Sequence, residues 1–138
     1  MRAINRRSFI AFISAAIPSI FLNKAEAAGA QYGALLAKST AIKVGQTQVY
    51  GAKDSNGRSF EVVLTRSKTG LTALDGTCTH QGCLVDVKKR ALVCPCHGSV
   101  FNPASGAVVM GPGGSSKDSI RPLNKFKVTE KSGKIYVK

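Results

Sequence analysis

The sequence is poor in the residue types that would indicate several common kinds of protein. It has no Trp and only 3 Tyr among 138 residues, so a nucleic-acid surface built on stacked aromatic side chains is poorly supplied. A mean hydropathy of +0.01 excludes a protein with many membrane spans. The chain holds only 4 Cys and 2 His, and all of them lie within residues 78–97. Such a restricted distribution predicts that these side chains act as ligands.

The first 27 residues have the pattern of an export signal. A basic start precedes an uncharged run at residues 8–22, and Ala25-Glu26-Ala27 offers small residues to signal peptidase. Arg6-Arg7, followed by Ser8-Phe9-Ile10, resembles the bacterial twin-arginine signal, whose route carries folded proteins. We therefore expect an exported bacterial protein, in the periplasm or at the outer face of the cytoplasmic membrane.

Cleavage before Ala28 is the expected fate of this leader, and retention as a short membrane anchor stays open. A helix over residues 8–22 would reach only about 22 Å of a hydrocarbon core about 30 Å thick. Pro18 also interrupts the run. These two features favour cleavage.

Acidic residues are scarce, with 7 Asp+Glu against 20 Lys+Arg and a net charge of +13. Residues 1–27 hold four of the basic residues and one acidic residue, so the remainder carries +10. A basic surface suits acidic proteins, anionic lipid headgroups or nucleic acid. Export makes nucleic acid an unexpected partner. Lys88-Lys89-Arg90, a run of three basic residues, is expected in a solvated hairpin turn.

Short strand patterns fill the chain after residue 40, and no segment there sustains the apolar period of an amphipathic helix. An all-β fold of packed antiparallel sheets is predicted, in one domain over residues 41–138. Residues 28–40 are expected as a linker or as the lead-in to a first strand. The expected strands cover residues 48–53, 59–66, 71–74, 84–87, 91–94, 107–110, 125–129 and 134–137.

Two six-residue segments carry the chemistry: Cys78-Thr79-His80-Gln81-Gly82-Cys83 and Cys94-Pro95-Cys96-His97-Gly98-Ser99. Each offers thiolates and an imidazole, which suits a binuclear iron site where one iron takes two Cys and the other two His. A zinc site and a pair of structural disulfides are the alternatives. The spacing is not that of a zinc finger, and disulfides alone leave the His unexplained. Haem c and thioredoxin motifs need two residues between their cysteines, whereas a single Pro95 separates Cys94 from Cys96.

Both segments closely resemble the Rieske iron–sulfur family, and the similarity covers about residues 70–137. The resemblance implies a Rieske-like fold with a small cluster-binding subdomain of two loops, and one Rieske-type [2Fe–2S] cluster per chain. It implies a disulfide between Cys83 and Cys96, which fits an oxidising compartment and separates the chain from the cytoplasmic Rieske ferredoxins and oxygenase domains. The implied metal ligands are Cys78, His80, Cys94 and His97.

Further positions are implied to tune the cluster or to cover it. Gly98-Ser99 places a hydroxyl where the family donates one to a bridging sulfide, which raises the potential. High-potential members have Tyr where this chain has Phe101, and commonly an apolar residue where it has Gln81. We therefore predict a potential in the upper part of the Rieske range but below its top. Gly111-Pro112-Gly113 resembles the loop that covers the cluster.

The resemblance implies a one-electron carrier of a respiratory or photosynthetic chain, similar to the iron–sulfur subunit of cytochrome bc-type quinol:cytochrome c reductases. Its imidazoles would then be solvent-exposed and pass electrons. Implied partners are a c-type cytochrome, quinol through a cytochrome b subunit, and the membrane. The alternative is a free or peripheral periplasmic carrier, or a small subunit of another oxidoreductase such as a molybdenum enzyme, and the leader, Gln81 and Phe101 favour it. The chain has no recognisable nucleophile or acid–base pair, so no catalytic residue of its own is expected.

Overall fold

The computed structural model describes residues 33–138, which form three antiparallel sheets and short 3-10 turns. The first sheet has the order β1-β11-β10, with β1 (Ala34–Lys38), β11 (Lys134–Val137) and β10 (Val128–Lys131). The second has the order β2-β3-β4-β9, with β2 (Thr47–Lys53), β3 (Ser59–Ser67), β4 (Gly70–Asp75) and β9 (Lys125–Phe126). The third has the order β5-β6-β7-β8, with β5 (Asp86–Lys88), β6 (Ala91–Val93), β7 (Val100–Phe101) and β8 (Val108–Met110). The 3-10 turns are η1 (Ser39–Ala41), η2 (Pro112–Gly114) and η3 (Lys117–Ser119).

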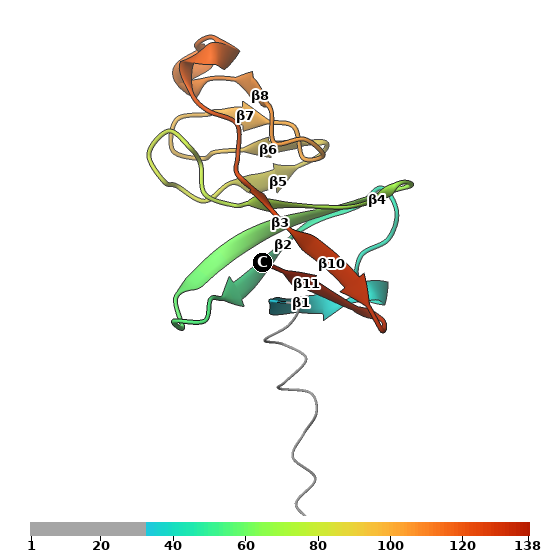
Figure 1. Ribbon diagram of the computed structural model, residues 1–138. Coiled ribbons are helices and arrows are strands. Elements are labelled where there is room, and N and C mark those ends of the chain that lie inside the picture. The colour runs from blue at the N-terminus through green and yellow to red at the C-terminus, as the bar shows by residue number, and fades with distance from the viewer. Residues whose placement is uncertain (1–32) are drawn as a thin grey trace, which may run out of the picture.

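The β2-β3-β4-β9 sheet lies between the other two sheets (Figure 1). Strand β3 explains this layering, because successive side chains of a strand point to opposite faces. Val62 and Leu64 are fully buried in the core shared with the β1-β11-β10 sheet. Val63, between them, is fully buried in the core shared with the β5–β8 sheet. Strand β3 therefore has consecutive apolar residues, without the apolar–polar alternation of a half-exposed strand, because both of its faces are buried.

The predicted all-β architecture is confirmed. Hairpins form at residues with a preference for turns. Strands β2 and β3 flank the Asn56-Gly57 turn, where Asp54 Oδ1 accepts the backbone N–H groups of Asn56 at 2.8 Å and Arg58 at 2.9 Å. The Lys88-Lys89-Arg90 run lies, exposed, in the β5–β6 hairpin as predicted. No described helix is long and apolar enough to span a membrane. The predicted leader over residues 1–27 lies outside the described residues.

The structure differs from the predicted strands in two places. The strand predicted over residues 125–129 is split, with β9 paired to β4 and β10 paired to β11. Lys127 is the crossing point, and it exchanges two backbone hydrogen bonds of 2.9 Å with Lys138. Local alternation does not reveal that one segment serves the edges of two sheets. The second difference concerns residues 28–40, expected as a linker or as the lead-in to a first strand: residues 34–38 form β1, which pairs with β11.

Candidate metal centre

The two predicted ligand segments form backbone turns of the same kind. In the first, the N–H of Cys78 donates to the carbonyl of Cys83 at 2.8 Å, and the N–H of Gly82 donates to that of Cys78 at 3.0 Å. In the second, the N–H of Cys94 donates to Ser99 at 2.8 Å, and that of Gly98 to Cys94 at 2.9 Å. The fifth residue of each turn is glycine with a positive φ, 78° at Gly82 and 70° at Gly98, a conformation that glycine adopts most readily.

A third turn of the same form joins β7 to β8. The N–H of Asn102 donates to Ala107 and the N–H of Gly106 to Asn102, both at 2.8 Å, and Gly106 has a φ of 74°. This turn has neither Cys nor His. The turn geometry is therefore a general solution for a short hairpin, and the first two turns differ from the third in the side chains they present.

Each ligand turn places one free thiol at its first position, in the interior. Cys78 and Cys94 are 2% and 1% exposed and lie in the core formed by the β3–β4 and β5–β8 regions. Burial raises the pKa of the Cys78 thiol above its ordinary value. A bound cation reverses this effect, because a coordinating thiol loses its proton to the metal. These two sulfurs suit a metal site at the edge of an apolar core.

The two imidazoles lie against each other at the outer side of the site. The ring centroids of His80 and His97 are 4.8 Å apart and the rings are nearly perpendicular, at 81°. His80 Nδ1 is buried and has no hydrogen-bond partner in the described part of the chain. His97 is exposed. The pair thus offers a buried ring nitrogen free to bind a metal and a ring in contact with solvent.

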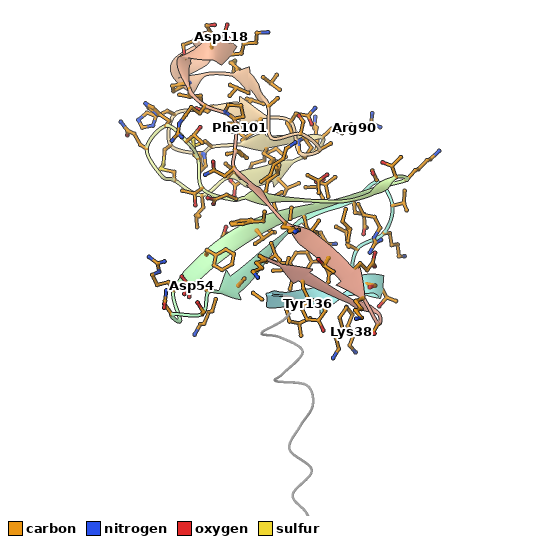
Figure 2. All side chains as sticks on the ribbon, in the orientation of Figure 1. Lys38, Asp54, Arg90, Phe101, Asp118 and Tyr136 are labelled. Atoms are coloured by element: carbon orange, nitrogen blue, oxygen red, sulfur yellow. A yellow bond between two sulfur atoms is a disulfide. The ribbon has the colours of Figure 1, made fainter. Side chains whose placement is uncertain are left out.

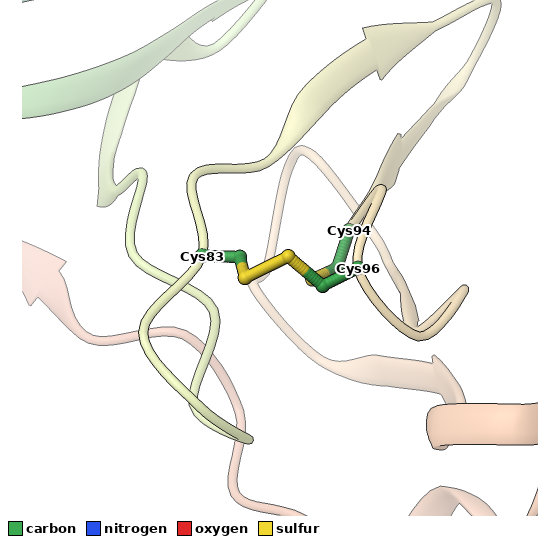
Figure 3. Close-up of side chains that lie close together, drawn as sticks. All are labelled: Cys83, Cys94 and Cys96. Atoms are coloured by element: carbon green, nitrogen blue, oxygen red, sulfur yellow. A yellow bond between two sulfur atoms is a disulfide. The ribbon is translucent and has the colours of Figure 1, made fainter.

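A disulfide between Cys83 and Cys96 connects the two ligand turns across 13 residues of sequence (Figure 3). It lies next to a free thiol, because the sulfurs of Cys83, Cys94 and Cys96 are all within 4.8 Å of one another. Disulfide sulfurs are not thiolates, so among these three residues Cys94 is the one able to bind a metal as a thiolate. The structure therefore separates the four cysteines into one bridge and two free thiols.

Ser99 and Phe101 both lie in the interior beside the thiols. The Ser99 side chain is fully buried, and its hydroxyl has no hydrogen-bond partner within residues 33–138. A buried hydroxyl without a partner is costly, so it indicates an acceptor at the site, where the cysteine sulfurs lie. Phe101 is also fully buried, in the same core as Cys78 and Cys94. It contributes packing and no hydrogen bond.

The glycine–proline loop is attached to the second ligand turn. The N–H of Gly113 donates to the carbonyl of His97 at 2.7 Å. Gly111 is buried, and a Cβ there would collide with the hydroxyls of Ser115 and Ser119. The backbone of Gly111 therefore packs directly against the segment that follows the loop. On the other side, the Thr79 hydroxyl donates to the carbonyl of Arg121. Sequence reasoning missed both attachments, because a contact with a backbone carbonyl leaves no trace in residue type.

Two buried thiols, two imidazoles and the buried Nδ1 of His80 without a partner in the described part of the chain form a donor set that fits a metal centre. Zinc accepts the same two Cys and two His, although the spacing of the ligands is not that of a zinc finger. A [2Fe–2S] cluster bound by two Cys and two His adds sulfide, which accepts hydrogen bonds. The donor set and the Ser99 hydroxyl together fit the cluster.

Comparisons with known proteins agree with this chemistry. A family model described as "Rieske [2Fe-2S] domain" matches residues 34–127. Among solved structures, the crystal structure of the plasma membrane Rieske protein PetC3 from the cyanobacterium Synechocystis superposes on this chain with a TM-score of 0.58. The two sequences are 30% identical, and the match covers 75% of this chain and 97% of that one.

Curated relatives include subunits of membrane complexes. The cytochrome b6-f complex iron-sulfur subunit of Chlorobaculum tepidum is 35% identical over 79 residues, which are 56% of this chain and 40% of that protein. The cytochrome bc1 complex Rieske iron-sulfur subunit of Streptomyces lividans is 39% identical over 59 residues, 39% of this chain and 35% of that protein. These matches thus span less than half the length of either relative.

Proposed function

This chain belongs to the Rieske [2Fe–2S] family, and from that premise we propose that it transfers single electrons in a respiratory or photosynthetic electron-transport chain. The observation that carries the proposal is the donor set, in which two buried thiols and two adjoining imidazoles meet at two turns joined by a disulfide. The bound cluster supplies a reversible one-electron change between its oxidised and reduced forms.

The residues that would hold the cluster are those of the family motif, and their burial supports the assignment. Cys78 and Cys94 would bind iron through their buried sulfurs. His80 and His97 would supply the two imidazole ligands, and the buried Nδ1 of His80 is free for that role. The Cys83–Cys96 disulfide keeps the two turns together, so that the four ligands stay in place whether or not the charge of the site changes.

Exposure differs between the two ligand types, and this difference sets the route of the electron. The thiol side of the site is enclosed by Phe101, Leu92 and Val85 in the core, which keeps water from the sulfurs. The His97 ring is exposed. Electrons therefore enter and leave at the imidazole edge, where a partner protein can approach closely.

The charge that arrives with the electron is stabilised by the Ser99 hydroxyl. Reduction adds one negative charge to the site, and a hydrogen bond to a cluster sulfur favours the more negative state. Ser99 is positioned for this, because its hydroxyl is buried beside the thiols and has no acceptor among the described residues. Phe101 contributes no second hydroxyl, so the potential lies below the top of the Rieske range.

The protein works outside the cytoplasm in this proposal. A disulfide within the site is favoured in an oxidising compartment, and the leader over residues 1–27 supplies the export signal, of twin-arginine type. The mature domain then extends from β1 through β11. Partners are redox proteins such as a c-type cytochrome, and quinol through a cytochrome b subunit.

A second candidate function is a peripheral periplasmic carrier, or the small subunit of another oxidoreductase. The departures at Phe101 and Gln81 favour it, because both lie in or beside the site. Phe101 lacks the second hydroxyl of the high-potential members, and Gln81 places an exposed polar side chain beside His80, where those members commonly have an apolar one.

An EPR-monitored redox titration of the purified full chain tests the proposal. We expect a Rieske-type signal with a midpoint between roughly −150 and +300 mV. A midpoint near the top of that range favours quinol oxidation, and a low one favours the peripheral carrier. Protein that contains zinc, or no metal, and gives no such signal would contradict both candidate functions.

A further inference from the structure

The outer side of the β1-β11-β10 sheet carries a group of lysines at the end of the molecule remote from the ligand turns. Its members are exposed, and we call them the outer lysine face: Lys38, Lys127, Lys131, Lys134 and Lys138. Figure 2 labels Lys38 and Tyr136 in this region.

Strand register places these lysines on one face. Lys134 lies directly opposite Lys38 on one side and Lys131 on the other, so three lysines form a row across three strands. Lys138 is opposite Lys127, with which it exchanges two backbone hydrogen bonds. Lys138 is four residues from Lys134, and side chains two or four residues apart share a face.

The alternate residues of the same strands face inward. Ile135 and Val137 are buried in the core against β3. Glu130 lies opposite Ile135 and binds Arg66 through both carboxylate oxygens, at 2.7 and 3.1 Å. The acidic residue of this sheet is therefore directed away from the lysines and neutralised. Among the described residues of the three strands, none on the outer side is acidic.

The middle row of the outer lysine face consists of Leu35, Tyr136 and Thr129. Leu35 lies opposite Tyr136, and Leu35 is 53% exposed whereas Tyr136 is 7% exposed. An exposed apolar residue surrounded by lysines is the arrangement of surfaces that settle at a lipid interface, where the charged ends meet headgroups and the apolar group enters the boundary.

We propose that the outer lysine face binds the anionic headgroups of a lipid bilayer. The chain itself supports lipid over an acidic protein. Strand β1 begins at Ala34 on the edge of this sheet, and the uncharged run at residues 8–22 precedes it by a connection of at most about 40 Å. During export, or with the leader retained, the bilayer is thus within reach of this face. Lysine, a point charge, also suits a field of headgroups, while bidentate recognition would favour arginine.

Binding through this face fixes how the site is presented, a step that rests on the proposed function. The β5–β8 sheet and its ligand turns lie on the far side of the β2-β3-β4-β9 sheet from the outer lysine face (Figure 1). A protein bound by its lysines therefore holds the sheet that carries the ligand turns on the side of the molecule away from the bilayer. That orientation suits a water-soluble redox partner and favours the peripheral carrier over quinol oxidation within the membrane.

Flotation of the full chain with vesicles tests the proposal. The vesicles are phosphatidylcholine alone, or phosphatidylcholine with phosphatidylglycerol. We expect binding to the anionic vesicles only, and a fall in binding as NaCl screens the charges. The variant Lys38→Gln/Lys131→Gln/Lys134→Gln removes the row of three lysines, and its partition onto anionic vesicles should fall at least about tenfold.

A matched variant removes the same charge at the other end of the molecule. Lys88→Gln/Lys89→Gln/Arg90→Gln changes the exposed β5–β6 hairpin, where Figure 2 labels Arg90. It should keep most of the binding. Equal losses in the two variants would overturn the proposal, because net charge alone would then explain the binding. Equal binding to both vesicle types, or binding insensitive to salt, would also overturn it by assigning the binding to the leader.

Absence of binding to anionic vesicles would likewise overturn the proposal. If the lysine-row variant then weakened binding to an acidic c-type cytochrome instead, the occupant would be a protein. Vesicle flotation needs no cluster, so its failure is distinct from failure of the EPR titration. A protein that shows the Rieske signal and does not bind vesicles keeps the proposed function and loses this inference.

Discussion

The two ligand turns have the same backbone and different last residues. Each begins with a buried cysteine and closes with the same pair of hydrogen bonds around a glycine. The first ends in Cys83, which forms the disulfide, and the second ends in Ser99, whose buried hydroxyl has no partner among the described residues. The last residue of the first turn holds the two turns together, whereas in the proposed function the last residue of the second offers a hydrogen bond to the bound cluster.

The third turn, over residues 102–107, shows what the backbone alone contributes. It repeats the hydrogen bonds and the glycine, and its first residue is Asn102. Asn102 Oδ1 accepts the N–H groups of Ala104 at 2.8 Å and Ser105 at 3.1 Å, so its side chain is used within the turn. The thiols at the same position of the ligand turns remain free for metal.

Loss of a first-position cysteine should have the largest effect. Cys78→Ser and Cys94→Ser should each lower the iron content per chain at least about tenfold and abolish the Rieske EPR signal, because a thiolate ligand is lost. Iron analysis and EPR measure the result. Asn102→Ser, at the equivalent position of the third turn, should leave the iron content unchanged. Retention of the cluster in either cysteine variant would contradict the ligand assignment.

Removal of the disulfide should have the next largest effect. Cys83→Ala/Cys96→Ala should lower the free energy of unfolding by about 3 kcal/mol, since the bridge closes a short loop in the unfolded chain. Denaturant unfolding of the variant and of the parent protein gives the value. If the variant unfolded at the same denaturant concentration as the parent, the disulfide would have no part in holding the turns together.

Replacing each of the three turn glycines by alanine should lower the free energy of unfolding more in the third turn than in the two ligand turns. At Gly82 and Gly98 a Cβ meets no atom within 4 Å, so the cost is that of a positive φ, about 1 kcal/mol each. At Gly106 a Cβ would also lie 3.0 Å from the Leu123 carbonyl oxygen and 3.1 Å from Leu74 Cδ2, which raises the cost to about 2–4 kcal/mol. Chemical denaturation ranks the three, and equal costs would disprove this account.

Ser99→Ala should lower the midpoint potential while the cluster stays bound. A hydrogen bond worth about 1.4 kcal/mol more in the reduced state corresponds to about 60 mV for one electron. Ser105→Ala removes a hydroxyl from the third turn and should leave the potential unchanged. Redox titrations of both variants decide the matter, and an unaltered potential in Ser99→Ala would leave the buried hydroxyl without this role.

Phe101→Tyr should raise the midpoint potential, by less than Ser99→Ala lowers it. The new hydroxyl can donate a hydrogen bond at the thiol side, but Phe101 is fully buried, so the core must give way to accept it. The same titration measures the shift, with unfolding measured in parallel. A potential that is unchanged or lower would refute the argument that the missing hydroxyl holds this protein below the top of the range.

Much of the site could be predicted from the sequence because its residues are close in the chain. Cys78, His80, Cys94 and His97 belong to two short segments, and thiols and imidazoles at such spacing have few uses. The hairpin turns could be predicted as well, since Asn56-Gly57 and similar pairs have local conformational preferences. The attachments of Gly113 to His97 and of Thr79 to Arg121 could not, because they end on backbone carbonyls.

What the sequence determined by itself is the chemistry: which side chains can bind a metal, where the chain turns, and that the remainder forms strands. The tertiary structure alone decided that residues 125–131 divide between two sheets and that β1 belongs to the domain. It also decided that five scattered lysines share one face, and that Ser99 is buried without a partner among the described residues. Ligand identity depends on neighbours in the chain, whereas register and burial depend on contacts between residues far apart in it.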